Sequence, residues 1–258
     1  MKAKLGQNFL LDPSILEFEA EAADVSKKSV LEIGAGDGRL THKLLSAGAG
    51  HITAVEIDPK FAKLLRMKFH TRVKVVEADF LLFDESVRFN RIVGNIPYYI
   101  TSPILFKLAK MNFGKAILCI QKEVAARMIA EPGTSQYGRL SVSCQLLFKT
   151  EILAVVTKEA FSPKPKVDSC IISLEKTGFA FDSKTEEIIG AFFSHKKKNL
   201  QNAVVDARET IFSSKDKHIA SQIAQTLKYG KRKVFTLSSS EVLEAVSQLR
   251  EAISHLEK

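Results

Sequence analysis

The first half of the chain alternates between two hydrophobic periods. Short apolar runs rich in β-branched residues are typical of buried strands, and they occur at residues 29–33, 51–55, 73–76, 92–93 and 116–120. Between these runs, apolar residues recur three and four positions apart, which predicts amphipathic helices. This alternation predicts an α/β fold, in which helices cover a mostly parallel sheet.

The second half follows a different pattern. An apolar helix is expected over Leu140–Phe148, and two more strands over Glu151–Val156 and Val167–Leu174. A turn at Thr177-Gly178 then ends the strand pattern. Further helices are expected at residues 183–194, 200–212, 215–227 and 238–256. We therefore predict one domain over residues 1–176 and a small all-helical domain over residues 177–258.

Three glycines at alternating positions follow the first long strand. Gly34, Gly36 and Gly38 allow the backbone to turn sharply and to approach a ligand closely. The turn resembles a nucleotide-binding loop, but the third glycine comes one residue early for a dinucleotide, whose diphosphate docks on a helix N-terminus. With Glu32 the pattern is Glu-x-Gly-x-Gly, which is typical of proteins that bind S-adenosylmethionine (AdoMet).

The next two predicted strands end in acidic residues. Glu56-Ile57 lies about 20 residues beyond the glycines, where a carboxylate can accept hydrogen bonds from both ribose hydroxyls. Asp79-Phe80 offers a carboxylate to an adenine amino group and a ring to pack on the base. Because ligands bind at the carboxyl ends of strands in open α/β sheets, these residues are predicted to share one site.

The fourth strand ends in Asn95-Ile96-Pro97-Tyr98, and this segment holds no acid, base or thiol. A carboxamide, a backbone carbonyl and an aromatic ring suit a flat, neutral, hydrogen-bonding group such as a nucleobase. A strand end followed by a proline turn would explain the tetrapeptide alone. The three strand ends before it favour the ligand-binding interpretation.

Charge and composition indicate a polyanionic partner. The formal net charge is +9, the pI is about 9.4, and the basic residues are spread over the chain rather than gathered in a tail. Two basic clusters stand out in the helical region, and either could be a solvated charge run. Their candidate phosphate-contacting residues are Lys196, Lys197, Lys198, Lys231, Arg232 and Lys233.

The sequence also excludes several classes of protein. No stretch approaches the roughly 18 consecutive apolar residues of a membrane span, and the N-terminus lacks the apolar core of a signal peptide, so we expect a cytoplasmic protein. The cysteines Cys119, Cys144 and Cys170 lie far apart in apolar runs. Their spacing argues against a disulfide framework and against a metal site.

Six segments carry a family resemblance. In chain order they are Gly6–Leu10, Leu31–Gly38, Asn95–Tyr98, Gln121–Ala125, Tyr137–Val142 and Phe161–Ser169. Together they resemble the KsgA-type ribosomal RNA adenine-N6 dimethyltransferase family, densely over residues 5–175. The chain departs from the family at Tyr99, where Asn or Gln is frequent, and at Thr157, where proline is frequent.

The resemblance implies a class I AdoMet-dependent methyltransferase, with a Rossmann-like, mostly parallel seven-stranded sheet and a small helical domain. It implies a monomer that methylates two adjacent adenosines, each twice at N6, near the 3′ end of ribosomal RNA in a small subunit or its precursor. The resemblance and the strand-end pattern together assign AdoMet binding to Asn8, Leu10, Gly34, Gly36, Glu56, Ile57, Asp79, Phe80 and Asn95.

The same resemblance gives the tetrapeptide a chemical role. The Asn95 side-chain oxygen and the Pro97 carbonyl would accept hydrogen bonds from the adenine amino group, and so direct its lone pair at the methyl group. Tyr98 would stack on the flipped base. Phe161 either stacks on the opposite face of the base or lies in the core. Catalysis is then mainly positioning, and no strong base is needed.

Three other functions are kept as alternatives. A resistance-type methyltransferase of large-subunit RNA shares Asn95–Tyr98, but Phe161–Ser169 favours the small-subunit branch. A non-catalytic assembly factor or nucleic-acid binder is disfavoured by the intact AdoMet pattern. A nicotinamide-dependent oxidoreductase is disfavoured by the early third glycine and by the lack of residues suited to hydride transfer.

Overall fold

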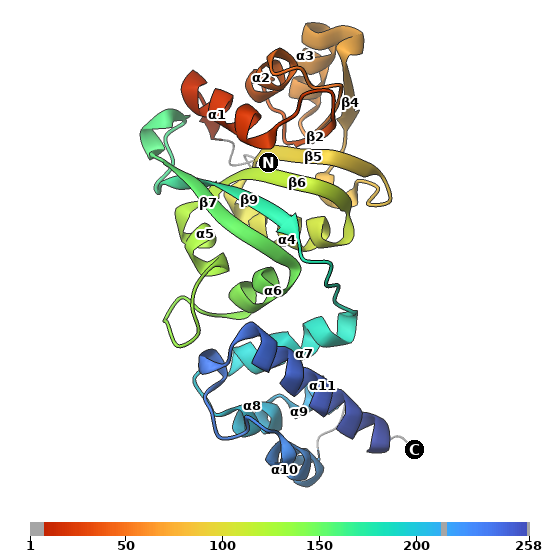
Figure 1. The fold of residues 1–258 in the computed structure, drawn as a ribbon, viewed down its shortest axis with the longest axis vertical. Coiled ribbons are helices and arrows are strands. Elements are labelled where there is room, and N and C mark those ends of the chain that lie inside the picture. Colours follow the sequence, from red (N-terminus) through yellow and green to blue (C-terminus); the bar gives the residue numbers. More distant parts are fainter. Residues whose placement is uncertain (1–7, 213–215, 257–258) are drawn as a thin grey trace. The chain divides into compact units, whose positions relative to one another are not determined.

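The structure is a computed structural model that describes residues 8–212 and 216–256. The chain divides into two compact units (Figure 1). The first contains the residues up to 125 together with 148–176, and the second contains 126–147 together with the residues from 177 onward. The division predicted at residue 176 differs from this one, because it assigns residues 126–147 to the first domain. Their helix packs instead against the helices of the second unit.

A seven-stranded sheet forms the centre of the first unit, in the order β4-β3-β2-β5-β6-β9-β7. Its strands are β2 (Ser29–Ile33), β3 (His51–Glu56), β4 (Val73–Glu77), β5 (Arg88–Asn95), β6 (Asn112–Gln121), β7 (Phe148–Val156) and β9 (Ser169–Lys176). The pairs from β4 to β6 are parallel, and β9 runs antiparallel to both β6 and β7. The predicted class of fold is therefore confirmed.

Helices cover both faces of this sheet. Helices α1 (Pro13–Ala23), α2 (Arg39–Ser46) and α3 (Pro59–Phe69) lie on one face, and α4 (Thr101–Lys110) lies on the other (Figure 1). Helix α5 (Lys122–Met128) follows β6 and reaches the boundary of the two units.

Local capping explains where these helices begin. Asp12 and Asp58 accept hydrogen bonds from the second residue of α1 and of α3, each of which starts at a proline, as the sequence predicts. Helix α4 has no side-chain cap, although Thr101-Ser102-Pro103 at its start is typical of a capped helix. Ile100 precedes the helix, and the Thr101 hydroxyl instead donates to the Tyr98 carbonyl at 3.3 Å.

A second, two-stranded sheet joins distant parts of the chain. Strand β1 (Phe9–Leu10) pairs antiparallel with β8 (Phe161–Ser162), and Leu10 stands opposite Phe161. The hydrophobic pattern predicts no element in the segment before α1, because a strand of two residues has no period and its partner is remote in sequence. Two residues of the first family segment, Gly6 and Gln7, lie outside the described residues.

The second unit is helical. Its helices are α6 (Arg139–Leu147), α7 (Ser183–Ser194), α8 (Leu200–Asp206), α9 (Arg208–Phe212), α10 (Lys217–Thr226) and α11 (Ser239–Leu256). The helix predicted over 200–212 is broken at Ala207, and the predicted start of α10 at Lys215 lies outside the described residues. A capping box starts α11, since Ser238 and Glu241 exchange hydrogen bonds of 2.8 and 3.2 Å, and the spacing Ser-x-x-Glu is typical of this motif.

Most of the loop over residues 131–139 is exposed, and Tyr137 is its buried residue. Tyr137 has no exposed surface, and its ring lies edge-on to Phe193 at a centroid distance of 5.9 Å. The Tyr137 ring thus anchors this loop in the core of the second unit.

Candidate active site

A pocket opens at the carboxyl ends of the parallel strands in the first unit. It lies where the strand order reverses, because β3 and β4 extend the sheet to one side of β2 while β5 and β6 extend it to the other. The residues that the sequence assigned to the cofactor or the base all line it: Asn8, Leu10, Gly34, Gly36, Glu56, Ile57, Asp79, Phe80, Asn95, Pro97, Tyr98 and Phe161.

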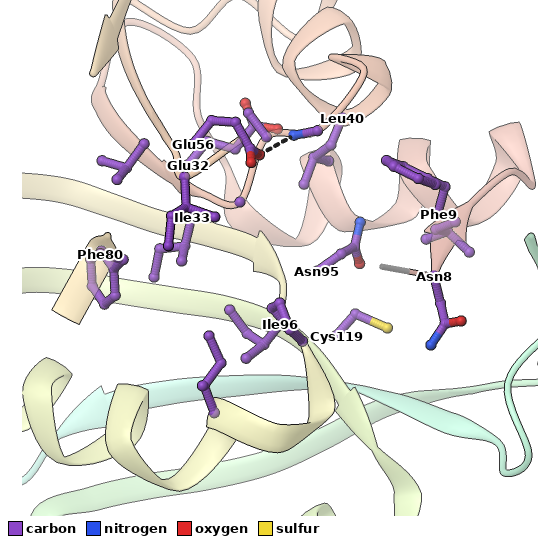
Figure 2. A pocket seen from close by; sticks show the side chains of 18 of the residues that line it. Asn8, Phe9, Glu32, Ile33, Leu40, Glu56, Phe80, Asn95, Ile96 and Cys119 are labelled. Carbon is purple, nitrogen blue, oxygen red and sulfur yellow. Dashed lines mark hydrogen bonds between the residues drawn. The ribbon is translucent and has the colours of Figure 1, made fainter. Parts of the chain in front are cut away.

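The glycine turn is tied to the end of the neighbouring strand. Gly34 and Gly36 have φ angles of +69° and +53°, which favour glycine. A Cβ on Gly36 would also lie 2.9 Å from the Phe9 ring. The Gly36 N–H donates a 2.8 Å hydrogen bond to Glu56 (Figure 2). This bond fixes the turn after β2 against the end of β3.

Glu56 is held in place by backbone groups. Its side chain is 3% exposed, and its second oxygen accepts from the Asp58 N–H at 2.9 Å. Each carboxylate oxygen has a second lone pair that these bonds leave free. Glu56 can therefore accept hydrogen bonds from a ligand's hydroxyl groups without leaving its own anchors.

The charge of the pocket distinguishes between ligands. Carboxylates line it at Asp37, Glu56 and Asp79, and Arg39, a basic residue of the lining, pairs with Asp37 at 2.8 Å. Such a lining repels the diphosphate of a dinucleotide. It fits AdoMet, which carries a cationic sulfonium and a ribose but no phosphate.

Glu32 is more deeply buried than its position at a strand end predicts. It is 1% exposed and accepts a 2.7 Å hydrogen bond from the Thr41 hydroxyl. Burial raises the pKa of Glu32 to about 8, and the nearby charge of Glu56 acts in the same direction. Glu32 is therefore protonated over much of the neutral range in the ligand-free protein.

Asn95 ends β5 at the floor of the pocket. Gly94 lets β5 approach β2 closely, since a Cβ there would lie 2.6 Å from the Ile33 carbonyl oxygen. Beyond Asn95, the Ile96 N–H donates to the Cys119 carbonyl at 3.0 Å, so the turn continues from the sheet itself. A rigid element thus carries Asn95 into the pocket.

A residue of strand β9 anchors the side chain of Tyr98. Its hydroxyl and that of Ser169 share a 2.8 Å hydrogen bond, and partial burial raises the pKa of Tyr98. No local sequence signal indicates this partner, because Ser169 reaches Tyr98 through the antiparallel strand β9. Tyr99 lines the pocket while remaining 62% exposed.

Phe161 lies in the core, which is one of the two alternatives that the sequence left open. It is 6% exposed and belongs to the core around α1, yet it also lines the pocket. Phe80 is similarly buried at 5% exposure, with its ring stacked on Phe83 at 6.3 Å. Both rings therefore hold fixed orientations beside the pocket.

A buried carboxyl group that the sequence did not single out lies on α1. Glu19 is 1% exposed and falls three positions after Leu16, on the apolar face of the helix. A carboxylate at a core position of an amphipathic pattern is a signal that could have identified it.

The two basic clusters differ in how their side chains are used. Lys196, Lys198 and Arg232 are bonded within the second unit. Their partners are the Ser135 and Tyr137 carbonyls for Lys196, Asp206 for Lys198 and Glu241 for Arg232. These bonds reduce the charge that the three residues can offer to an external phosphate.

The fold brings the two clusters together. The Val234 N–H donates to the Lys198 carbonyl at 3.0 Å, and Asn199 pairs with Lys233 in an isolated bridge. Lys197, Lys231 and Lys233 are exposed, and no ion pair joins them to the described part of the chain. We call these three residues the lysine patch.

Within the described ranges, no helix is both long and apolar enough to cross a membrane.

Comparisons with known proteins agree with this geometry. A model of the ribosomal RNA adenine dimethylase family matches residues 1–241. The chain is 41% identical over 212 residues to a probable ribosomal RNA small subunit methyltransferase A of Methanopyrus kandleri, over 79% of this chain and 76% of that one. A dimethyladenosine transferase of Plasmodium falciparum superposes with a TM-score of 0.79 at 27% identity, over 95% and 98% of the two chains. The 23S rRNA methyltransferase ErmE superposes at 0.65 with 29% identity, over 94% and 99%.

Proposed function

Because the chain belongs to the ribosomal RNA adenine dimethylase family and methylates ribosomal RNA adenine with AdoMet as donor, we propose that its targets are two adjacent adenosines near the 3′ end of small-subunit RNA. The curated relatives named as small-subunit methyltransferases support this choice. The six family segments support it as well, since Phe161–Ser169 follows the small-subunit branch.

We assign the cofactor to the acidic side of the pocket. When bound, AdoMet supplies an electrophilic methyl group on its sulfonium. Glu56 accepts hydrogen bonds from the ribose hydroxyls, and Asp79 accepts one from the adenine amino group of the cofactor. Gly34 and Gly36 leave room for the ligand beside the turn, and the remaining cofactor contacts come from Asn8, Leu10, Ile57, Phe80 and Asn95.

We assign the target base to Asn95–Tyr98. The Asn95 Oδ1 atom and the Pro97 carbonyl accept hydrogen bonds from the exocyclic amino group. These bonds favour a tetrahedral nitrogen whose lone pair is directed at the methyl group, which is a positioning effect. Tyr98 stacks on the base and is kept in place by Ser169. Phe161 bounds the opposite side. The methylated nitrogen is acidic and loses its proton to water.

The lysine patch is our proposed contact with the RNA backbone in the second unit. Its three side chains are exposed, whereas Lys196, Lys198 and Arg232 are engaged within the unit. We further propose that the protein acts as a monomer in the cytoplasm, on a small ribosomal subunit or its precursor.

The observation that supports this function best is the place of Asn95, at the end of a central strand and at the floor of an acidic pocket. The test is Asn95→Ala. The control is Asn112→Ala, which changes an exposed asparagine at the start of the neighbouring strand β6. We expect methyl transfer to ribosomal RNA to fall about 100-fold or more in Asn95→Ala, by analogy with loss of one positioned polar group elsewhere. An Asn95→Ala protein that methylates at the wild-type rate would overturn the assignment.

A further inference from the structure

Glu19 is a buried carboxyl group with no apparent structural use. It lies on the inner face of α1 with Leu16, Ala20 and Ala23. Within the described residues, neither of its carboxyl oxygens has a hydrogen-bond partner. Burying a polar group without a partner costs stability, so its presence in the core calls for another explanation.

The surroundings of Glu19 connect it to the pocket. Helix α1 packs on β5 and β6, where Asn95 and Cys119 stand opposite each other (Figure 2). Burial raises the pKa of Glu19 and the Asn95 amide opposes that rise, while the charge of Glu19 adds to the rise that burial causes in the pKa of Cys119. Asn95 and Cys119 line the pocket and Glu19 does not. Glu19 therefore lies behind Asn95 as seen from the ligand.

The Asn95 side chain also has an unsatisfied atom. Its Oδ1 is buried and, among the described residues, has no hydrogen-bond partner. A carboxamide has a donor end and an acceptor end, and rotation about its last bond exchanges them. An ionised Glu19 can accept only from the Nδ2 end of Asn95. A protonated Glu19 can donate to the Oδ1 end.

We propose that Glu19 is a positioning residue that determines which end of the Asn95 amide faces the target adenine. This inference rests on the proposed function of Asn95. With Glu19 ionised, Nδ2 faces α1 and Oδ1 faces the adenine amino group, which can then donate to it. With Glu19 protonated, Oδ1 faces α1 and accepts a hydrogen bond from the carboxyl group. The Asn95 Nδ2 group then faces the adenine amino group, and both of these groups are hydrogen-bond donors. The ionised state is the active one.

The charges around α1 allow both states. Burial raises the pKa of Glu19 to about 8, and the charge of Glu32 on β2 adds to the shift. The Cys119 thiol stays neutral, because burial also raises its pKa. The basic residues of the packed elements are directed elsewhere: Lys43 of α2 to Glu17, Arg91 of β5 to the Ala23 carbonyl and Asp24, and Lys115 of β6 to the Ala22 carbonyl. Protonation of Glu19 therefore changes around neutral pH.

The test is the pH dependence of kcat/KM for AdoMet, because this ratio reports ionisations of the free enzyme. Wild type, Glu19→Gln, Glu19→Leu, Glu32→Gln and the surface control Glu17→Gln are compared between pH 6 and 9.5. We expect the wild-type ratio to rise about tenfold per pH unit below the pKa of Glu19 and then to level off. Glu19→Gln loses this rise, whereas Glu32→Gln and Glu17→Gln keep it.

Glu19→Leu separates positioning from a purely structural role. It removes a buried carboxyl group, so its Tm stays equal to or above that of wild type, while kcat falls at least tenfold at pH 9, where Glu19 is ionised in the wild type. A Glu19→Gln profile that rises like the wild type, or a Glu19→Leu protein with wild-type kcat at pH 9, would refute the inference. Inactivity of Asn95→Ala in the same assay would show that the proposed function stands even then.

Discussion

Raising the pH from 5 to 8.5 is expected to destabilise the ligand-free protein through its buried carboxyl groups. Glu32 is 1% exposed, and burial raises its pKa from 4.5 to about 8. Between these values the folded protein holds a proton that the unfolded chain releases. The contribution of Glu32 to the free energy of unfolding is therefore largest below pH 4.5, and it is lost as the pH rises through 8.

The size of the effect follows from the two pKa values. A rise from 4.5 to about 8 corresponds to about 5 kcal/mol of unfolding free energy, at roughly 1.4 kcal/mol per pH unit. Burial raises the pKa of Glu19 from 4.5 to about 8 as well. Glu32→Gln should therefore remove at least about half of the loss that the two carboxyl groups cause together, because the charge of Glu32 also raises the pKa of Glu19. The glutamine can still accept the hydrogen bond of the Thr41 hydroxyl.

Urea unfolding followed by circular dichroism, at intervals from pH 5 to pH 8.5, measures this difference. The matched control is Glu17→Gln, which removes an exposed carboxylate from α1 without changing burial. Its pH dependence should parallel that of the wild type. Equal pH dependence in Glu32→Gln and wild type would show that Glu32 is ionised in the folded protein, and the argument from burial would be wrong.

Two further predictions concern the ligands. Gly36→Ala places a Cβ 2.9 Å from the Phe9 ring at a positive φ, so AdoMet affinity measured by calorimetry should fall about tenfold or more; unchanged affinity would place the ligand away from the turn. Replacing Lys197, Lys231 and Lys233 together by glutamate should make the fall of log affinity for ribosomal RNA with log salt concentration less steep by about 2. Each lost single-strand phosphate contact accounts for roughly 0.7 of this change. An unaltered slope would remove the lysine patch from the RNA contact.

Local sequence signals were sufficient for most of the first unit. The strands around Ile33 and Val55 have largely continuous apolar patterns because both faces of the sheet are covered there. Once the sheet is parallel, the carboxyl ends of its strands must lie at one edge. The meeting of Glu56, Asp79 and Asn95 in one pocket follows from that rule alone.

Features that depend on remote pairing could not be predicted in the same way. The two-residue strands that bring Leu10 opposite Phe161 are too short to have a period. The partner of Tyr98 is on a strand that returns antiparallel much later in the chain. In the sequence Lys196 is one member of a charge run. Its hydrogen bonds to the carbonyls of a distant loop form only in the folded unit. In each case the deciding contact is tertiary.

The position of the methyl groups on the RNA tests the central claim most directly. Small and large ribosomal subunits that lack the modification are incubated separately with the protein and labelled AdoMet, and the products are mapped by mass spectrometry. We predict dimethyladenosine at two adjacent positions near the 3′ end of small-subunit RNA, and no label in the large subunit. Label in the large subunit, or on a base other than adenine, would contradict the account.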